Sequence, residues 1–202
     1  MRIANWMLLP VLALPMFGQG YTDNDRGKAI SELEEGHRII SVILESCTAK
    51  QSTFKADSKK WSILEIVEHL ALTEDFLFGM IKKNLENGKP SEEPPAQDPD
   101  VFDQLVLKAI ADRGQKATSP EQATPKGKYG DLDQARQAFG ERRSKTVDWV
   151  RANKIPLRKY RSKSPVGEMD AHQWLLMLAA HTKRHAQQIE EVMQNPEYPK
   201  AQ

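Results

Sequence analysis

The chain has 202 residues, of which 28% are charged and 39% are hydrophobic, and its formal net charge is +1 at pH 7. This length and composition are typical of one soluble globular domain and exclude an intrinsically disordered chain. Acidic and basic residues are mixed along the sequence, which leaves no basic patch for a phosphate backbone, so nucleic acid is not an expected partner.

The first twenty residues have the pattern of a secretory signal peptide. Arg2 is followed by an uncharged apolar run from Trp6 to Phe17, and small residues then stand at Gly18 and Gly20. The run is shorter than the roughly 20 residues that a helix needs to cross a bilayer, and a small-x-small pattern suits signal peptidase. We therefore expect cleavage near Gly20.

Cleavage there predicts an exported protein, periplasmic or secreted, whose residues 21–202 form a single domain with no stable membrane span. The alternative is an uncleaved membrane anchor. Pro10 and Pro15 argue against the anchor because each would interrupt a continuous spanning helix. The mature chain contains only Cys47, which excludes an intramolecular disulfide in an oxidising compartment.

Apolar residues recur at spacings of three and four in four long segments, and no segment alternates like a half-buried strand over more than a few residues. The segment that follows Ser62 has the clearest start, because Ser62 and Glu65 form a capping box. The predicted fold is therefore all-α, a four-helix bundle. Its helices are expected at about residues 25–49, 62–87, 131–153 and 169–194.

The connections between these helices are longer than a simple up-and-down bundle needs, which predicts crossover connections. A Pro-rich stretch covers residues 88–99, and a short extra helix is expected at about 101–110. The next loop, at about 114–130, is rich in Lys, Gly, Thr and Pro. A loop of this length is either a functional lid or a disordered excursion.

Two histidines, His181 and His185, lie one turn apart in the last helix, on an apolar stripe that includes Trp174. The same helical wheel puts Thr182 outside this stripe. His69 lies in the apolar stripe of the 62–87 helix. A buried ring nitrogen without a partner costs about 1–3 kcal/mol, so inward histidines need partners.

Three inward histidines on two helices predict a three-nitrogen site for one divalent transition-metal ion. Neutral imidazoles suit Zn, Ni, Fe or Cu, and three protein ligands leave positions open for water or substrate. The alternative is that His69, His181 and His185 are separate core histidines, each with its own hydrogen bond.

Two residues are candidates for hydrogen bonds that orient the metal ligands. Gln188, one turn beyond His185, is placed either to orient a ligand or a bound water or to make an ordinary hydrogen bond on the helix face. Glu65, one turn before His69, could accept its second ring N–H, although the capping box already accounts for this glutamate.

The remaining polar candidates are less specific. His37, on the apolar stripe of the first helix, is either a core histidine or a fourth ligand or acid–base group. His172 falls opposite His181 on the wheel and is excluded from the site. Arg142 and Arg143 are interpreted as exposed arginines, which either meet an anionic substrate or are ordinary surface charges.

Two stretches carry a resemblance to a known family: Trp61-Ser-x-x-Glu65-x-x-x-His69-Leu, and Asp170-x-x-Gln173-Trp174 leading to His181-x-x-Arg184-His185. They resemble the DinB-like superfamily of DinB/YfiT-like metalloenzymes, over about residues 25–195. The resemblance implies a four-helix bundle, often a homodimer, with one divalent metal ion on His69, His181 and His185.

What the resemblance implies about activity is a metal-dependent hydrolase or transferase acting on a small molecule. The chain departs from the common H-x-x-H-H ending by having Arg184 before the last histidine. Together with an export signal, this makes cytosolic low-molecular-weight thiols unexpected co-substrates. The alternative function is a non-catalytic exported metal-binding bundle.

Overall fold

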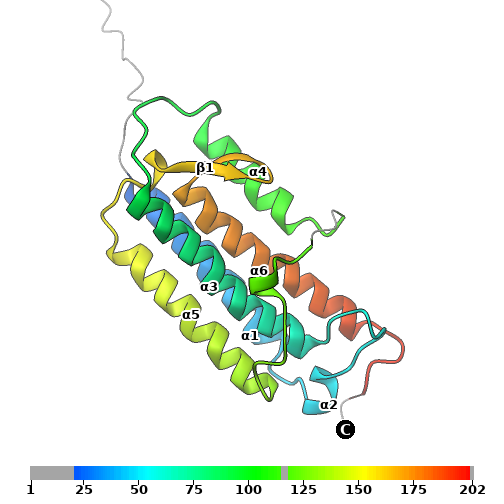
Figure 1. Cartoon of the computed structure of the whole chain (residues 1–202). Helices are drawn as coiled ribbons and strands as arrows, with labels where there is room; N and C mark the ends of the chain where they lie inside the picture. Colours follow the sequence, from blue (N-terminus) through cyan, green and yellow to red (C-terminus); the bar gives the residue numbers. More distant parts are fainter. Residues whose placement is uncertain (1–20, 115–117, 201–202) are drawn as a thin grey trace, which may run out of the picture.

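The computed structural model describes residues 21–114 and 118–200 (Figure 1). The predicted signal peptide therefore lies outside the described residues. Four long helices lie side by side as a bundle, which confirms the predicted all-α fold. They are α1 (Asp23–Ile43), α3 (Ile63–Asn87), α5 (Leu132–Ala152) and α6 (Ala171–Met193).

Two pairs of consecutive long helices, α1 with α3 and α5 with α6, are diagonal in the bundle, whereas α3 and α5 are neighbours. The main contacts of α1 are with α5 and α6, and those of α3 are also with α5 and α6. The links from α1 to α3 and from α5 to α6 therefore cross from one side of the bundle to the other, as predicted. These links carry four short elements: α2 (Ala49–Ser52), η2 (Leu157–Lys159), β1 (Arg161–Ser164) and β2 (Gly167–Asp170).

Capping side chains set where the long helices begin. Ser62 accepts a hydrogen bond from the backbone N–H of Glu65 and completes the predicted capping box. Asp170 caps α6 in the same way with Gln173, so this helix begins at Ala171 rather than at the expected Met169. None of the helices in the described ranges is long and apolar enough to span a membrane.

The antiparallel hairpin of β1 and β2 was missing from the sequence prediction. Both strands have four residues and consist largely of polar ones, so they show no alternation of apolar side chains. Met169 is buried, and Nε1 of the buried Trp174 donates to Ser162 of the hairpin. The hairpin thus covers the beginning of α6, and the predicted burial of Trp174 is confirmed.

The first helix is shorter than predicted and ends at Ile43 instead of near residue 49. Leu44 forms its C-cap, and Thr48 then starts α2 with a capping box of its own with Gln51. The short extra helix α4 runs from Pro99 to Ala111, close to its predicted position, and packs on α6.

Arg143 is not an exposed arginine, as the sequence suggested, but lies at the centre of the bundle with an exposed fraction of 2%. Its guanidinium donates to both carboxylate oxygens of Glu74 at 3.0 and 2.8 Å, to the carbonyl of Leu33 and to Thr182 Oγ1. Thr182 is likewise buried, contrary to the wheel, because α6 is covered on more than one side. This group joins all four long helices.

Candidate metal centre

The beginning of α3 lies beside the second half of α6 (Figure 1). Three histidine side chains from these two segments come together there. Nε2 of His181 is 3.3 Å from Nε2 of His69 and 3.1 Å from Nε2 of His185. His69 and His185 are 3% and 6% exposed, whereas His181 is partly accessible to solvent. The structure therefore brings together the three residues that the sequence singled out.

Hydrogen bonds fix the tautomer of two of these histidines. Nδ1 of His69 donates to the backbone carbonyl of Ala123 at 2.7 Å, and Nδ1 of His185 donates to Oε1 of Gln188 at 2.7 Å. A neutral imidazole carries one N–H, so Nε2 of each ring is left with a lone pair that faces His181. His181 has a single N–H, so it can donate a hydrogen bond to only one of these two lone pairs. A cation satisfies both.

Burial keeps the three rings uncharged. It lowers the pKa of His69, and the Ala123 carbonyl offsets this only in part. Burial, followed by the neighbouring His69, lowers the pKa of His185 to about 3. Burial and then the other two rings hold the pKa of His181 well below its usual value. All three are neutral at pH 7, which is the form of imidazole that binds metals.

The spacing of the nitrogens also suits a metal ion. Two Zn–N bonds of about 2.0–2.1 Å at a tetrahedral angle place their nitrogens about 3.3 Å apart. The contacts of 3.1 and 3.3 Å made by His181 agree with this value. Within the described part of the chain, His69, His181 and His185 form the one group of three or more His, Cys, Asp or Glu residues close enough to share an ion.

A chain of polar contacts holds Gln188 behind His185. Oε1 of Gln188 faces two donors, Nδ1 of His185 and, at 3.5 Å, Nη1 of Arg113. Arg113 is held in turn by Glu191, whose carboxylate accepts two hydrogen bonds of 3.0 and 2.6 Å. Two donors on the same side orient the amide with its oxygen towards His185, which keeps the proton of that ring on Nδ1.

The 114–130 loop supplies the matching contact behind His69. Within it, the 3₁₀ turn η1 (Glu121–Ala123) brings the carbonyl of Ala123 to the His69 ring. The loop is attached to α3 by Glu68, which is 1% exposed and accepts hydrogen bonds from the backbone N–H groups of Lys126 at 2.8 Å and Lys128 at 3.1 Å. The described part of this loop is thus docked on α3 beside the site.

Neither contact of this loop can be predicted from the sequence. A backbone carbonyl has no signature in the sequence, and no motif marks Glu68. Glu65, which the sequence proposed for a role behind His69, instead accepts hydrogen bonds from Ser62 N–H and Lys55. The group that accepts the hydrogen bond of His69 Nδ1 is the backbone carbonyl of Ala123.

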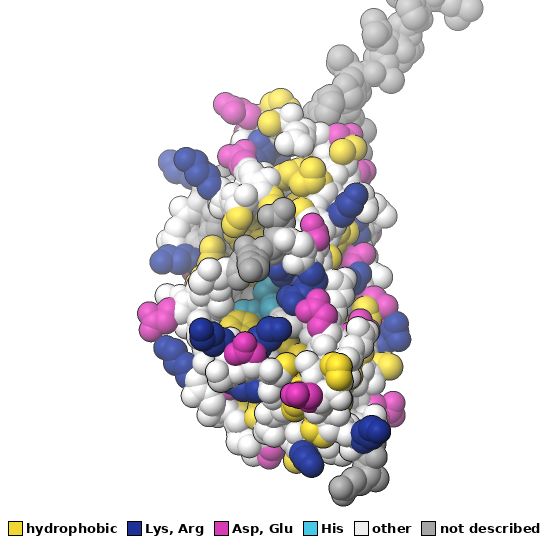
Figure 2. All heavy atoms as spheres, turned by 90° about the vertical axis from the view of Figure 1, so that its right-hand side faces the viewer, with side chains coloured by type: hydrophobic (Ala, Val, Ile, Leu, Met, Phe, Trp, Pro, Cys, Tyr) yellow, Lys and Arg dark blue, Asp and Glu magenta, His cyan; other side chains and the backbone are white. Residues whose placement is uncertain are grey.

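Trp61 forms an aromatic wall of the site. Its ring centroid lies 4.8 Å from that of His69 and 6.4 Å from that of His185, to which it is nearly parallel. Its position directly before the N-cap Ser62 places the ring over the first turns of α3. Figure 2 shows histidine surface at the bottom of a depression, with Lys and Arg side chains at its edge.

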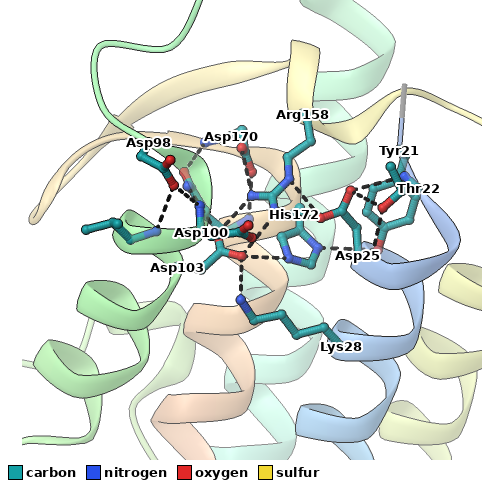
Figure 3. Close-up of polar contacts among 12 residues, drawn as sticks. Tyr21, Thr22, Asp25, Lys28, Asp98, Asp100, Asp103, Arg158, Asp170 and His172 are labelled. Atoms are coloured by element: carbon teal, nitrogen blue, oxygen red, sulfur yellow. Dashed lines mark hydrogen bonds and ion pairs between the residues drawn. The ribbon is translucent and has the colours of Figure 1, made fainter. Parts of the chain in front are cut away.

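The other two histidines lie elsewhere. His37 on α1 packs with its ring edge against Phe139 of α5 and lies outside the group of three. His172, at the beginning of α6, is fully buried in a polar cluster at the other end of the bundle (Figure 3). There Nε2 of His172 is 3.3 Å from Asp103 and Nδ1 is 3.4 Å from the Tyr21 hydroxyl. Its exclusion from the metal site agrees with the structure.

Arg158 is the centre of that second cluster. It donates to Asp25, Asp103 and Asp170 over distances of 2.6 to 3.2 Å, and Lys28 adds a contact of 2.8 Å to Asp103 (Figure 3). Burial alone would raise the pKa of Asp103, but hydrogen bonds from His172 and Arg158 outweigh it and hold this pKa far below its usual range. The cluster joins α1, α4, η2 and α6.

Comparison with known proteins supports the resemblance. The family model of the DinB superfamily matches residues 32–189, a range that contains all three clustered histidines. No curated protein and no solved structure matches the chain. The match covers most of the chain, including α3, α5, most of α1 and most of α6. The chain belongs to the DinB superfamily.

Proposed function

We propose that the chain holds one divalent transition-metal ion, Zn, Ni or Fe, on Nε2 of His69, His181 and His185, and acts as a metal-dependent hydrolase or transferase on a small molecule. The observation that carries this proposal is the pair of hydrogen bonds to Ala123 and Gln188. These hydrogen bonds leave a lone pair on Nε2 of His69 and another on Nε2 of His185. The two nitrogens lie 3.3 and 3.1 Å from Nε2 of His181.

Three protein ligands support an enzyme over a purely structural site, because structural zinc sites are usually closed by four. A divalent ion supplies Lewis acidity to a substrate group or to a water molecule. Around it, Ala123 and Gln188 hold two of the rings in place, and Trp61 offers a flat apolar surface to a bound molecule. The partial exposure of His181 gives access from solvent.

Metal analysis of the purified protein tests the first half of the proposal. We expect one divalent ion per chain, and less than a tenth of that in each of the variants H69A, H181A and H185A. His37→Ala serves as the matched control, because it removes a half-buried histidine outside the group of three. Full metal content in the three variants would show that they are separate core histidines.

A second measurement separates the enzyme from the non-catalytic metal-binding bundle. The protein loaded with Co²⁺ is titrated with imidazole, and its visible absorption is followed. An open position predicts a saturable spectral change. If the spectrum stays constant, the ion is fully ligated by the protein, and the non-catalytic alternative is correct.

We also propose that the protein acts outside the cytoplasm, after removal of residues 1–20. The support is the apolar run from Trp6 to Phe17 with Gly18 and Gly20 behind it. N-terminal sequencing of protein from the native host should begin within a few residues of Tyr21. An intact Met1 in the membrane fraction contradicts cleavage.

A further inference from the structure

We infer that the protein has a second binding site, which takes a small amphipathic anion, that is, a molecule with an apolar body and one carboxylate or phosphate group. The site is a groove of about 510 Å³ between the end of α3, the strand β1 and the beginning of α6. These three segments lie at the same end of the bundle (Figure 1). The volume is within the range of roughly 300–1,000 Å³ that is usual for small-molecule sites.

The floor of the groove is apolar. Ile81, Ala171 and Trp174 line it, and all three are buried. Met80 also lines it but is 41% exposed, which makes it one of the large hydrophobic residues that the described surface leaves in contact with water. Removing apolar surface from water is favourable in proportion to the area covered. A ligand with an apolar body that lies against Met80 and the floor gains this free energy.

The residues that line the groove carry positive charge only. Two of them, Lys83 and Lys163, are lysines, and none is Asp or Glu. Both lysines are exposed, and neither ammonium group forms a hydrogen bond or ion pair with a described residue. Glu168 stands opposite Lys163 in the hairpin, yet the ion pairs within the described ranges do not join these two residues. An apolar floor beside two unpaired cations is complementary to an amphipathic anion.

Ser162 offers a hydrogen-bond donor in the same groove. Its Oγ accepts a hydrogen bond of 2.9 Å from Nε1 of Trp174, which fixes the indole ring between α6 and β1. A hydroxyl group has one proton of its own to donate, and in the described part of the chain this proton has no acceptor. The carboxylate or phosphate of a ligand can accept it. The groove therefore combines a rigid aromatic surface, a hydroxyl donor and two cations.

The groove is distinct from the candidate metal centre. At 1.5 Å per residue, Met80 lies about 16 Å along α3 from His69. Trp174 precedes His181 by about 10 Å along α6. Trp61 stands beside the clustered histidines, whereas Trp174 lines the groove. The indole N–H groups of these two tryptophans therefore report on the two sites separately.

The test follows the two indole N–H signals by two-dimensional NMR while a probe is added to the isotope-labelled protein. The probes share one apolar body and are naphthoate, naphthyl phosphate and the uncharged naphthalenemethanol. Trp61→Phe and Trp174→Phe assign the two signals. The shift of the Trp174 signal with probe concentration gives the Kd for the groove.

Single charges are removed by Lys83→Gln and Lys163→Gln, which are also combined in a double variant. The matched control is Lys82→Gln. Lys82 is likewise exposed and is the neighbour of Lys83 on α3, but it does not line the groove, and its ammonium group lies over the ring of Phe78, 4.8 Å from the centroid. All substituted lysines are on the surface, and circular dichroism checks that each variant is folded.

In the wild type we expect one or both anions to shift the Trp174 signal in a saturable way, and the uncharged alcohol to bind more weakly. Lys83→Gln and Lys163→Gln should each raise the Kd of the bound anion about threefold, and the double variant about tenfold, the usual effect of losing partly exposed ion pairs. The Kd of naphthalenemethanol should stay within about twofold in every variant, as should all Kd values in Lys82→Gln. The anion that binds more tightly identifies the head group.

The inference is overturned if neither anion shifts the Trp174 signal, or if only the Trp61 signal moves, because the probe then binds beside the histidines instead. Equal anion affinities in the double variant and in Lys82→Gln overturn it as well, since the lysines of the groove then make no contact with the ligand. So does an alcohol that binds as tightly as the anions. None of these outcomes bears on the proposed metal ion, which the histidine variants test.

Discussion

The carbonyl oxygen of Ala123 lies 2.7 Å from Nδ1 of His69, so a backbone atom from a loop sets the tautomer of a residue on α3. This contact depends on how the loop is attached. Glu68 provides the attachment through two backbone N–H groups, and it is the neighbour of His69 in the sequence. The loop and the candidate metal ligand are therefore coupled through a single helix turn.

Glu68→Ala should weaken metal binding about 10- to 100-fold, the usual effect of losing a group that orients a metal ligand. The physical reason is that the N–H groups of Lys126 and Lys128 lose their acceptor, so the Ala123 carbonyl is no longer held. Competition with a chelator measures the affinity. Glu86→Ala removes an exposed glutamate from the same helix and should have no effect. Equal affinities in the two variants would falsify the coupling.

Substitutions of two metal ligands should be strongly non-additive. In a shared site the first change, His69→Ala, removes most of the binding free energy, and His185→Ala adds little because the ion has already gone. The quantity to measure is the metal-dependent rise in melting temperature for both single variants and the double variant. Losses that simply add, with metal retained, mean that each histidine acts on its own.

The metal-free protein should lose stability as the pH falls below about 6.5. The folded-state pKa of His185 is lowered from 6.5 to about 3, and those of His69 and His181 are also lowered. Between the folded and unfolded pKa values the unfolded chain binds protons that the folded chain does not. The free energy of unfolding is therefore highest above the unfolded pKa and decreases as the pH falls below it.

The decrease is at most about 1.4 kcal/mol per pH unit for each histidine. Urea unfolding at pH 7.5, 6 and 5 measures it, and the His185→Gln variant should show a shallower dependence than the wild type. The same slope in both proteins shows that His185 titrates normally in the folded state.

Breaking the Arg143–Glu74 pair should cost about 3–5 kcal/mol of unfolding free energy, because the remaining partner is left as an unpaired buried charge. Glu74→Ala tests this by urea denaturation. Removing both charges, as in Glu74→Leu with Arg143→Met, should cost less than Glu74→Ala alone. Arg142→Ala, which breaks a partly exposed pair with Asp75, should cost about 1 kcal/mol or less.

The sequence predicted the helices and the three clustered histidines because both rest on local signals. Apolar spacing marks the inner face of α6, and the capping box of Ser62 and Glu65 marks the beginning of α3. The features that could not be predicted from the sequence depend on tertiary contacts. Arg143 is buried only because Glu74 of another helix meets it, and the hairpin consists largely of polar residues. Ala123 contributes a backbone atom, which no residue type reveals.

The pairing of His69 with His181 joins positions 112 residues apart in the chain. An ion shared by these rings would act as a cross-link, closing a long loop that contains α4, all of α5 and the hairpin. Such a link restricts the unfolded chain more than a short one does. The opposite end of the bundle is held together by the ion pairs of Arg158 with three aspartates. Loss of the ion should therefore speed amide exchange at the beginning of α3 and in the second half of α6, while the region around Arg158 keeps its protection.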